Sequence, residues 1–231
     1  MMRNTIKSLL LDLLFPPRCA FCGRLLDASG DVCPACEASL PYREEEHILS
    51  AIGENQYLCA RTFYYEAMVR EGVKALKFGK KSWRARVFAR YIAQTAAEQL
   101  YGEFDAVTYV PVSWRRNFAR GFDQARLLAE GTARVWGKQA ESTLKKIRHT
   151  RAQSSLHDPR ARKRNVKDAY TVPDPAKAAG RRFLLIDDVC TTGSTLSAAA
   201  DALMEAGAAQ VVCAVLAGGH RETGKDGESL A

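Results

Sequence analysis

The residues with the clearest chemical potential lie in the stretch LLIDDVCTTGST (184–195), where an apolar run stops at two adjacent acids. Asp187 and Asp188 stand at the carboxyl end of a predicted strand, the place where open parallel sheets bind ligands. A turn into a predicted helix follows, and it contains Thr191, Thr192, Gly193, Ser194 and Thr195. Unpaired N–H groups and the helix dipole at such an N-terminus favour an anion, and glycine permits close approach of the backbone. The stretch predicts a phosphate in the turn and sugar hydroxyls or a hydrated metal near the acids; the alternative is a turn that only caps its helix.

A second candidate site is formed by two cysteine pairs near the start of the chain. The pairs are CAFC and CPAC, with Cys19, Cys22, Cys33 and Cys36. Four thiolates at this spacing can close a tetrahedral Zn²⁺ site, and a site filled entirely by protein ligands is structural rather than catalytic. An iron–sulfur cluster and four unligated thiols are the alternatives. Since residues 1–42 are too short for a core of their own, a metal would have to organise them.

The charge of the chain also points to an anionic partner. Its 231 residues carry a formal net charge of +8, and the segment from Lys145 to Lys167 is densely basic. Such a block is typical of proteins that bind a polyanion or a phosphorylated ligand, although a solvated loop without a partner has the same composition. A smaller basic cluster contains Arg115, Arg116 and Arg120.

The elements that must position these residues alternate in type. Apolar runs predict strands over 182–188, 210–218 and, within 106–112, a strand that ends at Pro111. Helical periodicity covers 83–100 and 197–207, and 118–136 predicts a turn followed by a helix. In the first helix the predicted face contains Trp83, Val87, Tyr91, Gln94 and Glu98, with Phe88, Ile92 and Thr95 beside it. In the last helix the predicted face contains Leu196, Ala199, Ala200, Leu203 and Met204. Strand, helix and strand in succession predict an α/β fold with a mostly parallel sheet and flanking helices.

Composition suggests three regions along the chain. We expect a cysteine-rich region over 1–42, one α/β domain over 43–219 and a polar, disordered tail over 220–231. No apolar run is long enough to span a bilayer, and the run at 9–15 predicts a short amphipathic helix rather than a signal peptide. The sequence therefore favours a cytoplasmic protein without membrane insertion.

The acidic stretch resembles the phosphoribosyl diphosphate (PRPP) binding motif of type I phosphoribosyltransferases. The resemblance implies that Asp187 and Asp188 contact the ribose hydroxyls, that Thr191 to Thr195 hold the 5-phosphate, and that Mg²⁺ accompanies the diphosphate. It also implies that a loop after an early strand binds the diphosphate. The residues matching that loop are Val112, Ser113, Trp114, Arg115 and Arg116. A basic surface loop without this role is the alternative.

Over nearly its full length the chain resembles the ComF family. The matching segments, in order, are LLFPPRCAFCGR, CPAC, EGVKALKFGKK (71–81), VPVSWRRNFARGFDQA (110–125), RAQSSLHDPRARKRNVKDAY (151–170) and LLIDDVCTTGSTL. Asp123 and Tyr170 are mild departures, at positions where the family often has Asn and Phe. The resemblance implies a type I phosphoribosyltransferase fold behind a four-cysteine zinc finger, and a role in bacterial DNA uptake, natural transformation or the use of DNA as a nutrient.

The resemblance leaves the reaction open, because no residue stands out as a general base or nucleophile. One hypothesis is a PRPP-dependent transferase with an unknown acceptor. Another is a single-stranded DNA-binding accessory factor that uses PRPP as a regulatory ligand, and a third is an adaptor for a DNA-uptake helicase. The basic segment would be a lid or a nucleic-acid groove in these readings. Its candidate contacts are Gln153, Arg160, Arg162, Lys163, Arg164 and Asn165.

Overall fold

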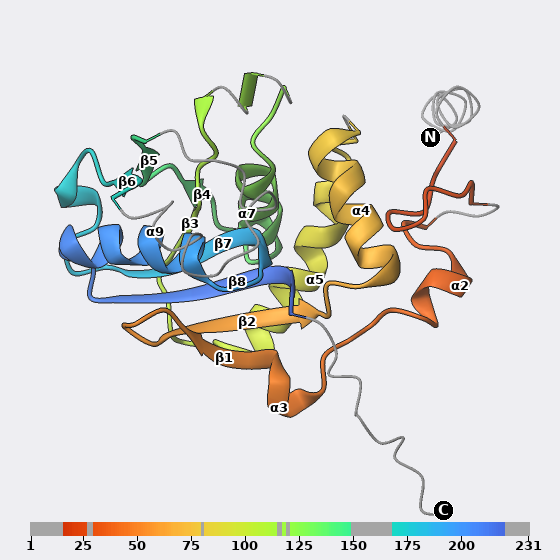
Figure 1. Cartoon of the computed structure of the whole chain (residues 1–231), viewed down its shortest axis with the longest axis horizontal. Helices are drawn as coiled ribbons and strands as arrows, with labels where there is room; N and C mark the ends of the chain where they lie inside the picture. Colours follow the sequence, from red (N-terminus) through yellow and green to blue (C-terminus); the bar gives the residue numbers. More distant parts are fainter. Residues whose placement is uncertain are drawn as a thin grey trace, which may run out of the picture.

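One mostly parallel sheet forms the centre of the protein, in the strand order β1-β2-β8-β7-β3-β4 (Figure 1). This computed structural model describes residues 16–26, 30–79, 81–114, 117–118, 121–148 and 168–219. The strands are β1 (Leu49–Ile52), β2 (Tyr57–Phe63), β3 (Ala106–Tyr109), β4 (Ala140–Glu141), β7 (Arg182–Cys190) and β8 (Gln210–Gly218). Only the β1–β2 pair is antiparallel among these described strands. The predicted α/β class with a mostly parallel sheet is confirmed.

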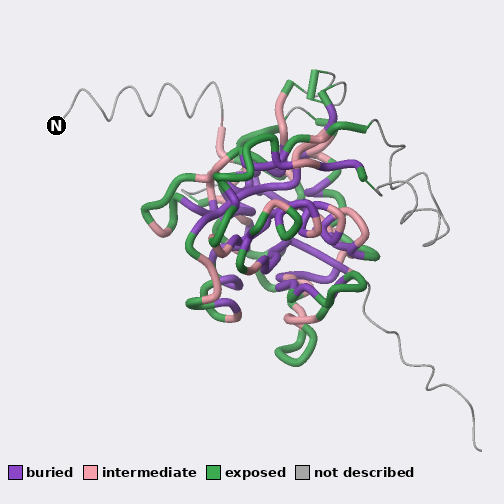
Figure 2. The backbone as a smooth tube through the Cα atoms, turned by 90° about the vertical axis from the view of Figure 1, so that its left-hand side faces the viewer, coloured by how far each residue is buried: buried purple, intermediate pink, exposed green. Residues whose placement is uncertain are grey.

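The two faces of the sheet carry separate cores, because successive side chains of a strand point to opposite faces. In β7, Leu184 and Ile186 pack towards α4 (Ala67–Phe78), α5 (Arg84–Gln99) and α7 (Gln124–Val135). Phe183 and Leu185 pack towards α9 (Ser194–Glu205) on the other face. Beside α9 lie β5 (Lys145–Lys146), β6 (Tyr170–Thr171) and the 3-10 helix η2 (Pro175–Lys177). Figure 2 shows the buried residues running continuously through the interior.

The predicted strands correspond to β3, β7 and β8, with two changes of length. Strand β3 ends at Tyr109, two residues before its predicted end at Pro111, which lacks the N–H that would continue the ladder. The last backbone hydrogen bond towards β7 runs from the N–H of Val110 to the carbonyl of Ile186. Strand β7 runs two residues beyond its predicted end because β8 continues to pair with it, Cys190 opposite Gly218.

The positions of the helices along the chain were predicted better than the faces that they bury. Helix α9 begins at Ser194, three residues before the predicted start, so the hydroxyl-rich turn forms its first turn. The predicted face of α5 was wrong at its C-terminal end, where Gln94 and Glu98 are exposed, but Val87 of that face is buried. The buried stripe instead runs through Phe88 and Ile92, which were predicted beside that face. The apolar stripe is completed by alanines, which pack closely against the sheet and which a search for large residues overlooks. In α9 the predicted face is buried except for Met204, which is 38% exposed.

The cysteine-rich region packs on α5 through one aromatic side chain. The ring centroid of Phe21 lies 5.2 Å from that of Phe88 and 5.9 Å from that of Phe63. Arg84 is buried beneath it and donates to the backbone carbonyl of Phe21 at 3.0 Å. Short helices α2 (Pro34–Glu37) and α3 (Glu45–Ile48) lead from this region to the sheet. The expected helix at 9–15 and the expected tail at 220–231 lie outside the described residues.

No helix in the described part of the chain has the length and apolar character needed to cross a membrane. The predicted boundaries at residues 42 and 219 stay predictions.

Candidate functional site

The two acids lie at the carboxyl edge of the sheet, near the end of β7. Asp187 pairs with Val215 of β8 in register and is partly exposed, whereas Asp188 is buried. By alternation, Asp188 shares the face of Ile186 towards α4 and α7, and Asp187 shares the face of Leu185 towards α9. The backbone N–H of Asp188 donates to Oδ1 of Asp187 at 2.8 Å. The pair therefore presents one accessible carboxylate and one enclosed carboxylate.

A lysine that sequence reasoning gave no role pairs with the enclosed acid. Nζ of Lys77, in the last turn of α4, lies 2.8 Å from Oδ1 of Asp188, and the two side chains are 22% and 5% exposed. Burial acts to lower the pKa of Lys77, but the carboxylates of Asp188 and Asp187 outweigh it and leave that pKa raised. The other oxygen of Asp188, Oδ2, is buried without a hydrogen-bond partner among the described residues.

The electrostatics of the acids reflect their crowding. Burial, followed by the negative charge of Asp188, raises the pKa of Asp187 well above its usual range, although Lys77 acts in the opposite direction. A third acid, Asp123, also lies near: burial raises its pKa, and the charge of Asp188 adds to that effect. Among the described residues, three carboxylates thus lie near the ammonium group of Lys77 at this edge of the sheet.

The turn after the acids is shaped by a glycine packed against the sheet. Gly193 has φ +73° and is the N-cap of α9. A Cβ atom on it would lie 2.8 Å from Cβ of Ile52, too close for any other residue. The hydroxyls of Thr192 and Ser194 are hydrogen-bonded at 2.8 Å. The turn lines a surface hollow formed by residues 189–196, which is where the predicted phosphate would sit.

Cys190 lies behind this turn and is not accessible as a nucleophile. It is 1% exposed. A hydrogen bond with the thiol of Cys59 and the charge of Arg61 lower the pKa of Cys190 to about 7, against the effect of burial. Cys59 itself lies opposite Cys213 in the β2–β8 register, so these two buried cysteines are neighbours.

The predicted diphosphate loop follows β3, beside the acids. Asp123 is the N-cap of α7, and its carboxylate accepts the N–H groups of Val112 at 2.9 Å and Arg126 at 3.2 Å. Ser113 is buried and Trp114 is exposed. One acid thus ties the start of the loop to the start of α7 through both of its carboxylate oxygens, whereas an Asn has only one acceptor oxygen for these two N–H groups. Arg115 and Arg116 lie outside the described residues.

The predicted lid residues cannot be placed, because 149–167 lies outside the described residues. This range contains Gln153, Arg160, Arg162, Lys163, Arg164 and Asn165. The two lysines that begin the basic segment are described, and they pair with β6 in a two-stranded sheet, Lys146 opposite Tyr170.

The four cysteines converge as the spacing predicts. The sulfur atoms of Cys19, Cys22, Cys33 and Cys36 all lie within 4.8 Å of one another, and the Cys22 and Cys33 sulfurs are 3.8 Å apart. A tetrahedral ion with Zn–S bonds of about 2.3 Å requires sulfur separations of about 3.8 Å. Burial acts to raise the pKa of Cys19, but hydrogen bonds, foremost from the backbone of Cys33, lower it to about 6. The donor set fits structural zinc.

Comparison with known proteins gives a match for each of the two segments that contain these candidate sites. Residues 127–229 match the phosphoribosyl transferase domain, and residues 10–49 match the double zinc ribbon domain. The chain is 32% identical over 200 residues to DNA utilization protein YhgH of Salmonella typhimurium, covering 84% of this chain and 86% of that protein. It is 27% identical over 201 residues to Competence protein F of Haemophilus influenzae, covering 84% and 82%.

More distant similarities extend the comparison. The chain is 26% identical over 194 residues to Competence protein ComFC of Bacillus subtilis, covering 84% of this chain and 74% of that protein. Among solved structures, glutamine PRPP amidotransferase from B. subtilis superposes with a TM-score of 0.40 and 23% identity, covering 59% of this chain and 26% of that one.

Proposed function

The chain belongs to the ComF family, and on that premise we propose that it binds PRPP at the edge of the sheet formed by the end of β7 and the start of α9. The observation that carries the proposal is the sequence of acid pair, left-handed glycine and helix N-terminus in one continuous segment. A ribose 5-phosphate has matching ends: hydroxyls for the acids and a phosphate for the turn. The proposal includes Mg²⁺ on the diphosphate, which keeps most of its own waters and needs few protein ligands.

The acid, the glycine and the helix N-terminus of the segment each have a role in this proposal. The partly exposed carboxylate of Asp187 accepts a ribose hydroxyl. The first turn of α9, beginning at Ser194, directs backbone N–H groups and the positive end of its dipole at the 5-phosphate. Gly193 lets the backbone come close to the phosphate. Trp114 and the residues before it flank the diphosphate.

We further propose that bound PRPP is used for transfer to an acceptor. In that step the C1–O bond to the diphosphate breaks, a bond from C1 to the acceptor forms, and the acceptor loses a proton to solvent or to the departing diphosphate. Positioning and neutralisation of the leaving group supply most of the catalysis in such a reaction. The acceptor class is a nucleobase, a nucleotide or a nucleic acid, in keeping with the DNA-linked names of the relatives.

The test is calorimetric titration with PRPP and Mg²⁺, followed by an assay for released diphosphate. We expect wild-type protein to bind PRPP and Asp187→Asn to bind at least about tenfold more weakly, since a charged hydrogen bond is lost. Diphosphate release on adding one acceptor class supports transfer. Binding of PRPP without release of diphosphate for any acceptor contradicts the transferase proposal. Absence of PRPP binding contradicts the PRPP site itself.

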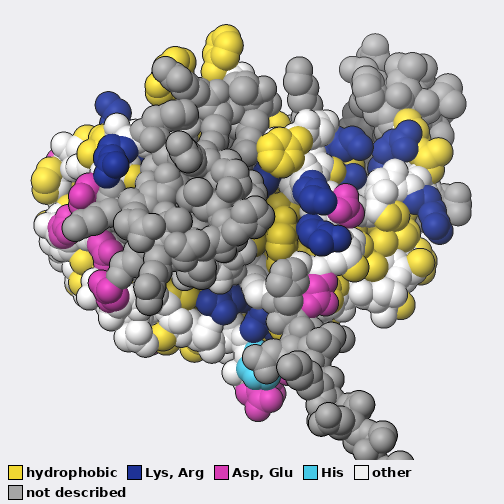
Figure 3. Space-filling view, in the orientation of Figure 1, with side chains coloured by type: hydrophobic (Ala, Val, Ile, Leu, Met, Phe, Trp, Pro, Cys, Tyr) yellow, Lys and Arg dark blue, Asp and Glu magenta, His cyan; other side chains and the backbone are white. Residues whose placement is uncertain are grey.

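A second candidate function is binding of single-stranded DNA, with PRPP as a regulatory ligand. It is favoured by exposed aromatic side chains: Phe78 on α4, Trp114 and Phe118 are 70%, 74% and 88% exposed. Aromatic surfaces of this kind stack with bases. Lys and Arg side chains gather over α4 and the neighbouring cysteine-rich region in Figure 3, and the exposed basic residues of α4 include Arg70 and Lys74.

The DNA candidate predicts a steep salt dependence. Binding of an oligonucleotide should weaken as salt rises, and charge reversal at Arg162, Lys163 and Arg164 should reduce the slope. Trp114→Ala should weaken binding without changing that slope, because stacking releases no counterions. Oligonucleotide binding that does not change with salt concentration contradicts this candidate function. A helicase partner and a cytoplasmic location belong to the same proposal and follow from the role in DNA uptake.

A further inference from the structure

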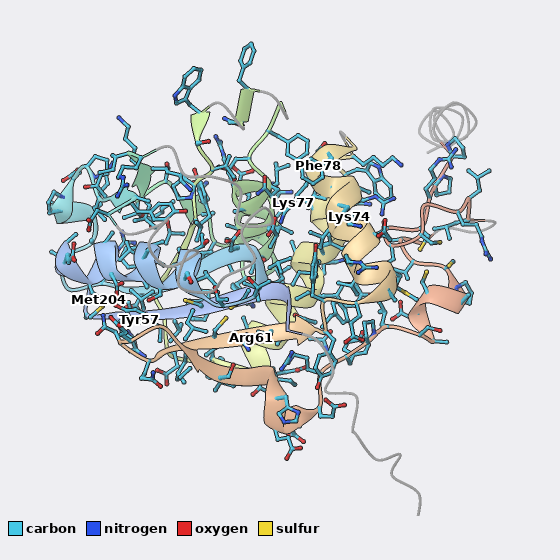
Figure 4. The ribbon with its side chains drawn as sticks, viewed as in Figure 1. Tyr57, Arg61, Lys74, Lys77, Phe78 and Met204 are labelled. Carbon is cyan, nitrogen blue, oxygen red and sulfur yellow. The ribbon has the colours of Figure 1, made fainter. Side chains whose placement is uncertain are left out.

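The ion pair between α4 and β7 joins the acid segment to a helix that carries no part of the PRPP motif. Lys77 lies one residue from the end of α4, and Nζ is 2.8 Å from Oδ1 of Asp188. Figure 4 shows Lys77 on the side of α4 nearer to α7, away from Lys74. Lys74 is half exposed and pairs within its own helix with Glu71 at 2.9 Å. Lys77 is therefore largely enclosed and paired with β7, whereas Lys74 is half exposed and paired within its own helix.

The charge at the sheet edge explains why this lysine matters. Asp123, Asp187 and Asp188 interact with one another through their negative charges. In the described part of the chain, the ion pair that involves these three acids joins Lys77 to Asp188. PRPP is itself a polyanion. A site with three uncompensated carboxylates would repel it at short range, where the low dielectric weakens screening.

The geometry also assigns different tasks to the two adjacent acids. Asp188 has Oδ1 on Lys77 and Oδ2 enclosed by protein, so its carboxylate is held from the side of α4. Its backbone N–H in turn fixes Oδ1 of Asp187 at 2.8 Å. Lys77 thus orients the accessible carboxylate indirectly, through Asp188 and the backbone between the acids.

We propose that Lys77 is a positioning residue for the ribose end of PRPP: it anchors Asp188 and offsets its charge, so that Asp187 receives the sugar hydroxyls without repelling the anionic ligand. This role rests on the proposed function. It differs from a direct contact of Lys77 with the diphosphate, which the same experiment distinguishes.

The experiment compares Lys77→Gln with Lys74→Gln as the matched control, since both remove one lysine charge from α4. PRPP affinity is measured by calorimetry in Mg²⁺ from pH 5.5 to 8. The ratio of variant to wild-type dissociation constants is taken at each pH, which cancels the titration of the ligand. We expect a ratio of about ten or more for Lys77→Gln at pH 8, from the size of the charge interaction that is lost, and about one for Lys74→Gln.

The pH profile is the readout that a merely structural role would not produce. The titratable groups that face the acid pair are Lys77 and Tyr65 from the α4 side, Asp123 from α7 and Cys213 from β8. Without Lys77 the crowded acids take up a proton more readily, which reduces their repulsion of PRPP. The Lys77→Gln ratio should therefore fall towards one as the pH is lowered to 5.5. A ratio that is constant across pH, or near one throughout, overturns the proposal.

A second ligand separates the two ends of the site. Ribose 5-phosphate carries the hydroxyls and the 5-phosphate but no diphosphate, so a positioning role predicts the same Lys77→Gln ratio for it. A loss seen with PRPP and absent with ribose 5-phosphate means direct contact with the diphosphate and overturns the proposal. If neither wild type nor Lys74→Gln binds PRPP, the proposed function itself fails.

If Lys77→Gln does not fold, a double variant in which both partners of the ion pair are neutral still tests the proposal. The double variant Lys77→Gln/Asp188→Asn removes both charges and leaves no unpaired buried ion. We expect it to fold and to bind PRPP more weakly than wild type by a factor that does not vary with pH. Wild-type affinity in the double variant contradicts any role for the ion pair.

Discussion

Replacement of Gly193 by alanine tests whether the β1 strand sets the shape of the proposed phosphate turn. The left-handed conformation at φ +73° costs an alanine about 1 kcal/mol. The new Cβ would lie 2.8 Å from Cβ of Ile52, whereas carbon atoms normally approach to about 3.5–4.0 Å. Overpacking of this kind costs about 1–3 kcal/mol. No rotamer change of Ile52 relieves it, because the contact involves its Cβ, so the turn itself must move.

The expected total is about 2–4 kcal/mol, which lowers the melting temperature by about 5–15 °C for a chain of this size. Gly180→Ala is the matched control, with φ +69° and nothing within 4 Å of an added Cβ. It carries only the conformational cost and should lose about 2–4 °C. Differential scanning calorimetry measures both, and PRPP titration should show a loss only in Gly193→Ala. Equal losses in the two variants would refute the packing argument.

Three further predictions concern the rest of the fold. Removal of zinc by a chelator, or Cys22→Ser, should unfold the cysteine-rich region and lower the melting temperature, as metal analysis and calorimetry can show; a metal-free preparation with unchanged melting would contradict structural zinc. Arg84→Met should cost about 1–3 kcal/mol because it leaves buried carbonyl groups without a donor, while the exposed Arg86→Met should cost under about 1 kcal/mol; similar urea midpoints would contradict this. Asp123 has a raised folded pKa, so it binds more protons in the folded state and its contribution to stability falls as pH rises from about 4 through that pKa; urea unfolding should show this decline reduced in Asp123→Asn, and an identical pH dependence would refute it.

The sheet was predictable because local pattern and tertiary structure agree there. The apolar runs that became β7 and β8 are bounded by polar residues and glycine, and their burial on both faces suits a parallel sheet. The inner face of α5 was not predictable in the same way. Its packing surface relies on alanines, so a periodicity judged by large side chains selected Gln94 and Glu98 instead. The end of β3 was predicted at Pro111 and lies two residues earlier, at Tyr109.

The site residues also differ in how far the local sequence predicts them. The turn and the cysteine cluster are continuous or closely spaced in sequence, so their residue types alone predict their chemistry. The roles of Asp123 and Lys77 depend on which elements meet at the sheet edge, and no local pattern carries that information. The signal nearest to Lys77 was the segment EGVKALKFGKK, which matched the family pattern without indicating a partner.

The cost of the acid pair argues that it serves a ligand rather than the fold. A buried ion pair adds little stability compared with apolar residues of the same volume. The preceding positions on that face of β7, Leu184 and Ile186, are apolar and fully buried, so a third apolar residue at position 188 would continue the core without a desolvation cost. The chain instead places Asp188 there and provides Lys77 from a different element to hold it. Such an arrangement is explained if the acid must be charged and fixed in place before a polyhydroxyl anion arrives.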